Sequence, residues 1–289
     1  MFDKRNRWII NVVMAIAAIA FMGVLIAPFL GAFQQTGSQT ASTAASPTVS
    51  PAAQQAELET QAKGYQLVLQ REPNNQTALR GLLEIRIRQG DIKGAIEPLQ
   101  KLAELNPDEA DYTILLAQAK QRLGDREGAA QAYRDILKTQ PGNIGALQGF
   151  VDLMLEQQRP EAAVGLLQDT LRGANDANKV KPGSVDVASV QLLLGRVYAE
   201  QQKFSEAIAI YDQAIDSNPQ DFRPVLGKAI VLQRQGKNDD AAPLFTQAVS
   251  LAPAQYKDQI NQLATGATPT PAATTAPTNM SPATPPASP

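Results

Sequence analysis

Residues 197–219, VYAEQQKFSEAIAIYDQAIDSNP, decide the fold of this chain. The stretch has the pattern of a helix end, a tight turn and a second amphipathic helix. It stops at Asn218 and Pro219, because the residue before a proline avoids the α region. Similar stretches recur through the middle of the sequence, with gaps of 34, 34, 78 and 34 residues between their final prolines, which are Pro73, Pro107, Pro141, Pro219 and Pro253.

A second series supports the same period. Alanines with gaps of 34, 34, 44 and 34 residues stand at Ala95, Ala129, Ala163, Ala207 and Ala241. A large apolar residue follows each alanine by four positions, at Leu99, Tyr133, Leu167, Tyr211 and Phe245. The small side chain lets two helices approach closely, and the large one fills the space one turn along.

A period of 34 residues with helix–turn–helix units is the signature of the tetratricopeptide repeat. The chain resembles that family from about residue 55 to 265. The resemblance implies an all-α fold, a right-handed α-solenoid whose concave face is lined by the first helix of each unit. The expected elements are a leading helix 55–72, repeats 76–109, 110–143, 144–177, 188–221 and 222–255, and a closing helix 256–264.

The turn inside each unit contains glycine or polar residues, which end a helix at low cost. Asp91, Asp125 and Ser205 follow three of these turns and are predicted to cap the next helix. The gap of 44 residues leaves about ten extra residues, which fit a loop over 173–186 that is rich in Gly, Pro, Asn and Asp. Such a loop is either a tolerated surface insertion or a segment that contacts a partner.

The amino terminus predicts a membrane anchor. Residues 1–7 form a basic tip, and the apolar run 8–33 is long enough to cross a hydrocarbon core as one transmembrane helix. A cleaved signal peptide is the alternative, although its apolar core would be shorter. Residues 34–54 and 266–289 carry no charge in the first case and only Pro, Thr, Ala and similar residues in the second, so we expect a tether and a disordered tail.

The charge asymmetry around the apolar run predicts its orientation. Lys4, Arg5 and Arg7 precede the run, and no Lys or Arg follows within twenty residues. The positive-inside rule places the tip in the cytoplasm and the repeats on the opposite side of the membrane. The alternative is a thylakoid or plasma membrane with the repeats on the cytoplasmic side.

Composition argues against catalysis. The chain has no cysteine and no histidine, which removes thiolate nucleophiles, imidazole bases and the usual zinc ligands. It also lacks a Gly-x-Ser-x-Gly elbow and a Walker-type phosphate loop. We therefore expect no enzyme activity, no cofactor and no small-molecule substrate. The net charge of −2 leaves no basic surplus for nucleic acid, so the expected partner is a protein.

The resemblance also implies which residues face the groove. They are Arg80, Glu84, Arg88, Gln118, Arg122, Asp152, Glu156, Arg196, Glu200, Arg223, Ile230 and Arg234. Six of them are arginines, a residue type favoured in interfaces. The alternative is that these are ordinary solvated charges that are partly neutralised by neighbouring Glu and Asp.

Two functions fit this organisation. The first is a membrane-tethered scaffold that binds a segment of a partner protein in the groove and serves assembly or localisation of a membrane complex. Its layout resembles that of anchored tetratricopeptide proteins of cyanobacteria and plastids, which implies photosynthetic-complex assembly or interaction with protochlorophyllide reductase. The second is an exported envelope component with a structural or secretion role, anchored by an uncleaved signal sequence.

Overall fold

The computed structural model describes residues 50–266, which contain twelve α-helices and no strand. The basic tip, the predicted transmembrane helix 8–33 and nearly all of the tail lie outside the described residues. The helices are α2 (Pro51–Arg71), α3 (Gln76–Arg88), α4 (Ile92–Leu105), α5 (Ala110–Arg122), α6 (Arg126–Thr139), α7 (Ile144–Glu156), α8 (Pro160–Val180), α9 (Val187–Glu200), α10 (Phe204–Ser217), α11 (Phe222–Arg234), α12 (Asn238–Leu251) and α13 (Ala254–Ala264).

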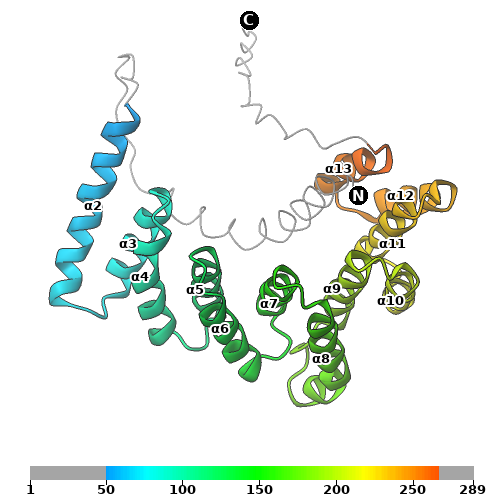
Figure 1. Cartoon of the computed structure of the whole chain (residues 1–289), viewed down its shortest axis with the longest axis horizontal. Coiled ribbons are helices and arrows are strands. Elements are labelled where there is room, and N and C mark those ends of the chain that lie inside the picture. Colours follow the sequence, from blue (N-terminus) through cyan, green and yellow to red (C-terminus); the bar gives the residue numbers. More distant parts are fainter. Residues whose placement is uncertain (1–49, 267–289) are drawn as a thin grey trace, which may run out of the picture. The chain divides into compact units, whose positions relative to one another are not determined.

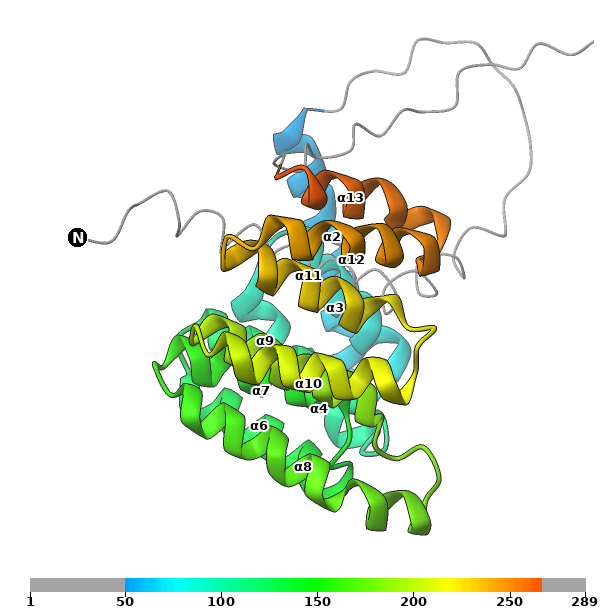
Figure 2. The same cartoon turned by 90° about the vertical axis from the view of Figure 1, so that its right-hand side faces the viewer.

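The helices stack in chain order. Each one packs against the next, and the first helices α5, α7, α9 and α11 also contact one another directly. Figure 1 shows α5, α7 and α9 along the inner edge of the curved stack, with α6, α8 and α10 outside them. The view turned by 90° shows the axes of α10, α11, α12 and α13 as successive layers (Figure 2). The predicted solenoid of helix pairs is therefore the observed fold.

The turn inside each unit depends on one residue with a left-handed backbone. Three units use glycine, with φ of 69° at Gly90, 85° at Gly124 and 78° at Gly236. The other two use Gln158 and Gln202, with φ of 59° and 60°. A non-glycine residue adopts this conformation only when the surrounding structure enforces it. The stacking of the two helices thus determines the turn geometry even where the sequence does not favour it.

Side-chain caps begin several helices. Asp91 and Asp125 each accept a hydrogen bond from the backbone N–H three residues later, as predicted. The prediction for Ser205 is wrong, because α10 begins one residue earlier, after Lys203, and has no side-chain cap. Ser205 lies inside the first turn, where its hydroxyl is not placed to cap the helix.

Aromatic residues of second helices pack into gaps on the first helices. A Cβ added to Gly149 would lie 2.4 Å from the hydroxyl of Tyr133, and one added to Gly227 would lie 2.8 Å from the ring of Tyr211. Tyr133 is completely buried, and Tyr211 is 5% exposed. Contacts this short leave no space for a methyl group. Glycine in the first helix is therefore what admits the tyrosine of the preceding second helix.

The ten extra residues do not form the loop predicted over 173–186. Instead α8 continues to Val180 and has 21 residues, where the other second helices have 14. The added turns bury Ala174, which is 1% exposed, and partly bury the Ala177 side chain against the same core. Helix formation wins over the Gly/Asn/Asp composition because packing overrides weak local preferences.

A short loop, residues 181–186, returns the chain from α8 to α9. The Asn178 side chain accepts a hydrogen bond from the Val185 backbone N–H and donates one to its carbonyl, both at 2.9 Å. Val185 is 3% exposed, and a Cβ on Gly142 would lie 2.1 Å from the Ser184 carbonyl oxygen. The loop is therefore held against the turn between α6 and α7.

The helix at the start of the stack begins earlier than predicted. α2 starts at Pro51, inside the predicted tether 34–54, and packs against α3 through Ala62 and Tyr65. No helix within residues 50–266 has both the length and the apolar composition needed to cross a membrane. The membrane question therefore concerns the amino-terminal run alone.

Candidate groove face

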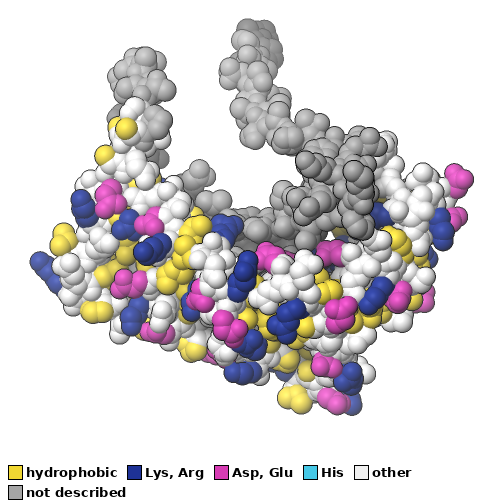
Figure 3. Space-filling view, viewed as in Figure 1, with side chains coloured by type: hydrophobic (Ala, Val, Ile, Leu, Met, Phe, Trp, Pro, Cys, Tyr) yellow, Lys and Arg dark blue, Asp and Glu magenta, His cyan; other side chains and the backbone are white. Residues whose placement is uncertain are grey.

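The exposed side of the first helices α3, α5, α7, α9 and α11 is called the groove face here. All twelve predicted groove residues lie on these five helices. Several of them form links between one first helix and the next, which shows that they lie where consecutive first helices meet. Figure 3 shows basic and acidic side chains interspersed across the visible face, without a separate patch of either charge.

The link between α7 and α9 is centred on Arg196. Its Nη2 donates to the Asp152 carboxylate at 2.6 Å, across 44 residues of sequence. Its Nε lies 3.9 Å from the Glu200 carboxylate, too far for a hydrogen bond. The side chains of Arg196, Asp152 and Glu200 are 19%, 33% and 17% exposed. One half-buried guanidinium therefore serves two half-buried carboxylates.

The pKa values of these carboxylates show that the balance is incomplete. Burial raises the pKa of Asp152, and the charge and hydrogen bond of Arg196 only partly counter it. Burial likewise raises the pKa of Glu200, where Arg196 and the more weakly acting Arg234 oppose it. Glu156 adds a further negative charge beside Asp152 and accepts a hydrogen bond from Gln121 of α5 at 2.7 Å.

A buried hydroxyl lies beside the same group. The Tyr133 hydroxyl contacts α7 at Gly149, one turn before Asp152, and has no hydrogen-bond partner among the described residues. Burial raises the pKa of Tyr133, and the negative charges of Asp152 and Glu156 raise it further. These two charges place the hydroxyl oxygen next to the carboxylates of α7. A buried polar atom without a partner is uncommon and needs an explanation.

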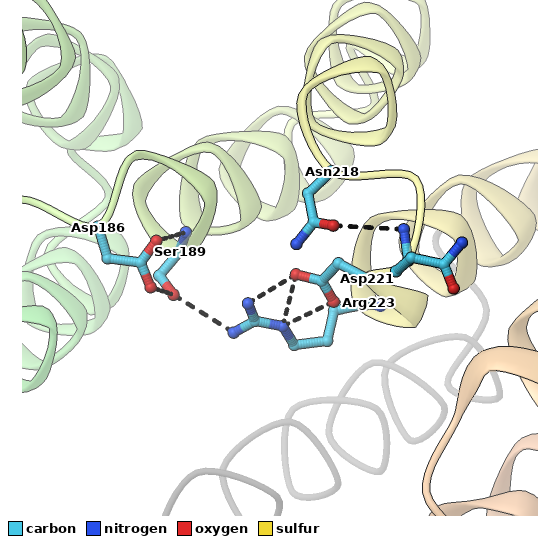
Figure 4. A network of polar contacts seen from close by, with 6 residues as sticks. Asp186, Ser189, Asn218, Asp221 and Arg223 are labelled. Carbon is cyan, nitrogen blue, oxygen red and sulfur yellow. Dashed lines mark hydrogen bonds and ion pairs between the residues drawn. The ribbon is translucent and has the colours of Figure 1, made fainter.

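The link between α9 and α11 is built around Arg223. Its Nε and Nη2 donate to the Asp221 carboxylate at 2.6–3.0 Å, and its Nη1 donates to the Ser189 hydroxyl at 3.3 Å (Figure 4). The hydroxyl of Ser189 in turn donates to Asp186 at 2.6 Å. Asp221 and Asp186 also cap α11 and α9. Burial raises the pKa of Asp221, but the hydrogen bonds and charge of Arg223 outweigh it and hold the pKa below its ordinary value.

The amino-terminal end of the groove face is more apolar. The guanidinium of Arg80 lies 5.9 Å from the centre of the Tyr112 ring, and Arg88 pairs with Glu84. Ile87 on α3 is 60% exposed, and Leu115 on α5 is 40% exposed. Exposed apolar side chains beside charged ones are typical of surfaces that bind other proteins.

The six predicted arginines therefore do different things. Arg196, Arg88 and Arg223 are paired with carboxylates of the same chain, and Arg80 stacks on a ring. Arg122 and Arg234 are exposed and form no ion pair or hydrogen bond with another described residue. Gln118 and Ile230 are half-buried on α5 and α11. The alternative of intramolecular neutralisation thus holds for the three paired arginines, and two remain open to a partner.

Sequence reasoning missed several participants, namely Gln121, Tyr133, Asp186, Ser189 and Asp221. Asp186 and Asp221 each stand directly before the apolar pattern of a first helix, a signal that could have marked them as caps. No comparable signal marks Ser189, because its partner is 34 residues away. Within residues 50–266 no group of three or more Asp or Glu is arranged to hold a metal ion.

Comparison with known proteins agrees with this architecture. The sequence profile of the tetratricopeptide repeat matches residues 77–253. Protein SLOW GREEN 1, chloroplastic, of Arabidopsis thaliana is 26% identical over 185 residues, which cover 64% of this chain and 57% of that protein. Cellulose synthase operon protein C of Pseudomonas fluorescens (strain SBW25) is 23% identical over 215 residues, which cover 70% of this chain and 16% of that protein.

The chain thus spans 57% or less of the length of these two relatives. Among solved structures, yeast Tom70 superposes with a TM-score of 0.52 at 16% identity, over 71% of this chain and 42% of the Tom70 chain. A similarity at this level of identity reports the fold alone. With a profile that covers more than half of the sequence, the chain belongs to the tetratricopeptide repeat family.

Proposed function

We propose that this protein is a membrane-tethered scaffold that binds a segment of a partner protein on its groove face. The observation that carries the proposal is the mixed character of that face. Ile87 and Leu115 are exposed on first helices, and Arg122 and Arg234 are exposed without an intramolecular partner. Such a combination of apolar contact and free guanidinium groups suits an extended or helical segment.

The tether follows from the sequence of the amino terminus. The apolar run 8–33 has the length of a membrane-spanning helix, and the array begins at Pro51. Holding the groove face close to a bilayer raises the effective concentration of a membrane-bound partner. This supports a role in assembling or localising a membrane-associated complex. The similarity to a chloroplast protein of Arabidopsis supports a photosynthetic membrane, with the array on the cytoplasmic or stromal side.

A second function is favoured by the charge distribution around the run. Lys4, Arg5 and Arg7 precede it without basic residues after it, which predicts export of the array. The similarity to cellulose synthase operon protein C supports a role for such an exported array in the bacterial cell envelope. The two functions share the groove face and differ in the side of the membrane.

Site-specific photo-crosslinking tests the groove. A photoreactive residue at Gln118, on a first helix, is expected to capture a defined partner in the native membrane, whereas one at Gln131, exposed on the second helix α6, is not. Arg122→Glu and Arg234→Glu together are expected to reduce the crosslink at position 118 at least tenfold, a loss of about 1.4 kcal/mol. Equal capture from both positions, or capture that survives the double change, would remove the groove face from the proposal.

The absence of cysteine allows a direct test of orientation. A single Gln247→Cys substitution places a thiol on the exposed side of α12, and the cysteine-free parent is the built-in control. Labelling of intact cells by a membrane-impermeant maleimide indicates the exported array. Labelling only after the membrane is opened indicates the cytoplasmic one. Recovery of the protein without membranes in both cases would contradict the tether.

A further inference from the structure

The part of the groove face between α7 and α9 has an excess of negative charge. Asp152, Glu156 and Glu200 contribute three carboxylates, and Arg196 contributes one guanidinium, which leaves −2 at this junction. The excess is local, because the next junction pairs Arg223 closely with Asp221. Half-buried carboxylates without enough cations are costly, since burial weakens their solvation.

The hydrogen bonds at this junction are incomplete in the same direction. No described residue donates a hydrogen bond to the Glu200 carboxylate, although its side chain is only 17% exposed. The buried Tyr133 hydroxyl, whose residue is 0% exposed, has no partner and lies beside the carboxylates of α7. Both groups offer acceptor oxygens, and Arg196 does not reach either of them with a hydrogen bond. The junction therefore lacks donors that carry positive charge.

We infer that the α7–α9 junction is a subsite that receives a lysine or arginine side chain of the partner segment, with Asp152, Glu156 and Glu200 as its anionic wall. This inference rests on the proposed function, because it names the partner chemistry for the groove face. An ammonium or guanidinium group supplies several donors and a positive charge at once. A metal ion does not fit, since the described carboxylates are not arranged to bind one.

Tyr133 has a specific part in this subsite. Its hydroxyl can rotate, and the oxygen accepts a hydrogen bond from a donor that enters beside Asp152. Its position is fixed by the contact with Gly149, so the oxygen is placed before the partner arrives. Tyr133 is therefore a positioning residue at the base of the subsite, and the carboxylates supply most of the attraction.

The test uses the full chain in detergent micelles and methyl-labelled NMR spectra. The probes are capped glycine–serine heptapeptides with a central arginine, lysine or citrulline. We expect the arginine and lysine peptides to shift the methyl signals of Leu155 on α7 and Leu192 on α9, and the neutral citrulline peptide to leave them unchanged. The pair Asp152→Asn and Glu200→Gln is expected to weaken this binding at least tenfold.

The matched control is the pair Glu161→Gln and Asp216→Asn, which changes the net charge equally at exposed positions on α8 and α10. It is expected to bind as the parent does. Tyr133→Phe keeps the ring and removes only the hydroxyl, so it is expected to fold normally and to weaken binding a few-fold. Each variant's methyl spectrum without peptide reports its fold.

The inference is wrong if the citrulline peptide binds equally, if the shifts appear elsewhere, or if the control pair loses as much affinity as the subsite pair. It is also wrong if the cationic peptides cause no shift. The proposed function fails separately, when photo-crosslinking at Gln118 captures no partner. If that crosslink persists and is insensitive to neutralising Asp152 and Glu200, the groove function stands and the cationic subsite does not.

Discussion

The junctions α7–α9 and α9–α11 join first helices across different lengths of chain. The first spans 44 residues between equivalent alanines and the second 34, yet both bring an arginine of one first helix to a polar group of its neighbour. At the longer step Arg196 reaches Asp152 and stands among an excess of carboxylates. At the shorter step Arg223 is closely paired with Asp221 and bonded to Ser189.

This difference teaches that the stacking of first helices is set by their packing surfaces and not by the number of residues between them. The ten extra residues are absorbed on the outer side, by a longer α8 and a short loop. It also teaches that an arginine on the groove face cannot be interpreted by its type alone. Its role depends on the number of carboxylates that the neighbouring helix brings to it.

The largest effect is expected from breaking the longer step at Gly142. A Cβ there would lie 2.1 Å from the Ser184 carbonyl oxygen and 2.6 Å from Cα of Val185, so Gly142→Ala must displace the backbone of the 181–186 loop. We expect the free energy of unfolding to fall by about 2–3 kcal/mol, as for an overpacked core. Urea-induced unfolding followed by circular dichroism measures it.

The control is Gly165→Ala in the interior of α8, where nothing lies within 4 Å of the added Cβ. That change is expected to stabilise the protein by up to about 1 kcal/mol, because alanine favours helix over glycine. If both substitutions shift stability alike, the packing of the loop on Gly142 does not hold the longer step in place.

A smaller loss is expected from Asn178→Ala. The Asn178 amide makes two hydrogen bonds to the backbone of Val185, whose peptide group would be left buried without partners. We expect a loss of about 1–2 kcal/mol in the free energy of unfolding. Asn175→Ala, at an exposed site one turn earlier, is the control and should change little. Faster amide exchange at Val185 in the Asn178 variant alone would locate the effect, and unchanged exchange would contradict it.

The shorter step is tested by Asp221→Asn, which removes a negative charge from the Arg223 pair. We expect a loss of about 1 kcal/mol at pH 7, because Arg223 is partly solvated and the asparagine still caps α11. The pKa of Asp221 is held below its ordinary 3.8 in the folded state. The stabilisation it supplies is therefore present above pH 3.8 and is lost as the pH falls through the folded pKa. The variant should lack this acid-dependent component, and an unchanged acid limb would contradict the pairing.

The smallest effect, with the opposite sign in pH, is expected for Asp152→Asn at the longer step. Burial raises the pKa of Asp152 above its ordinary 3.8, so the folded state binds its proton more tightly than the unfolded state. The contribution of this carboxyl to stability therefore falls as the pH rises from 3.8 through the folded pKa. The variant lacks that fall, so relative to the parent it should gain about 0.5 kcal/mol across this window. Unfolding measured at several pH values decides the sign, and a relative loss would show that Arg196 fully compensates Asp152.

Much of the fold could be predicted from local pattern. The spacing of Ala207 and Tyr211, repeated along the chain, identified the helix pairs, and Asp91 and Asp125 were identified as caps. The site was predicted less well. The twelve groove residues were placed on the right helices, but nothing in the spacing indicated that Arg196 and Arg223 would be paired within the chain while Arg122 would stay exposed.

The sequence by itself determined the repeat, the helix pairs and the family, because a period of 34 residues and the caps of each helix are encoded within single units. Only the tertiary structure decided that residues 173–180 are helical, that Tyr133 lies without a partner against α7, and that three carboxylates share one arginine. These features depend on contacts between residues 30 or more positions apart or on burial by a neighbouring unit. Such contacts have free energies that local preferences along the chain do not contain.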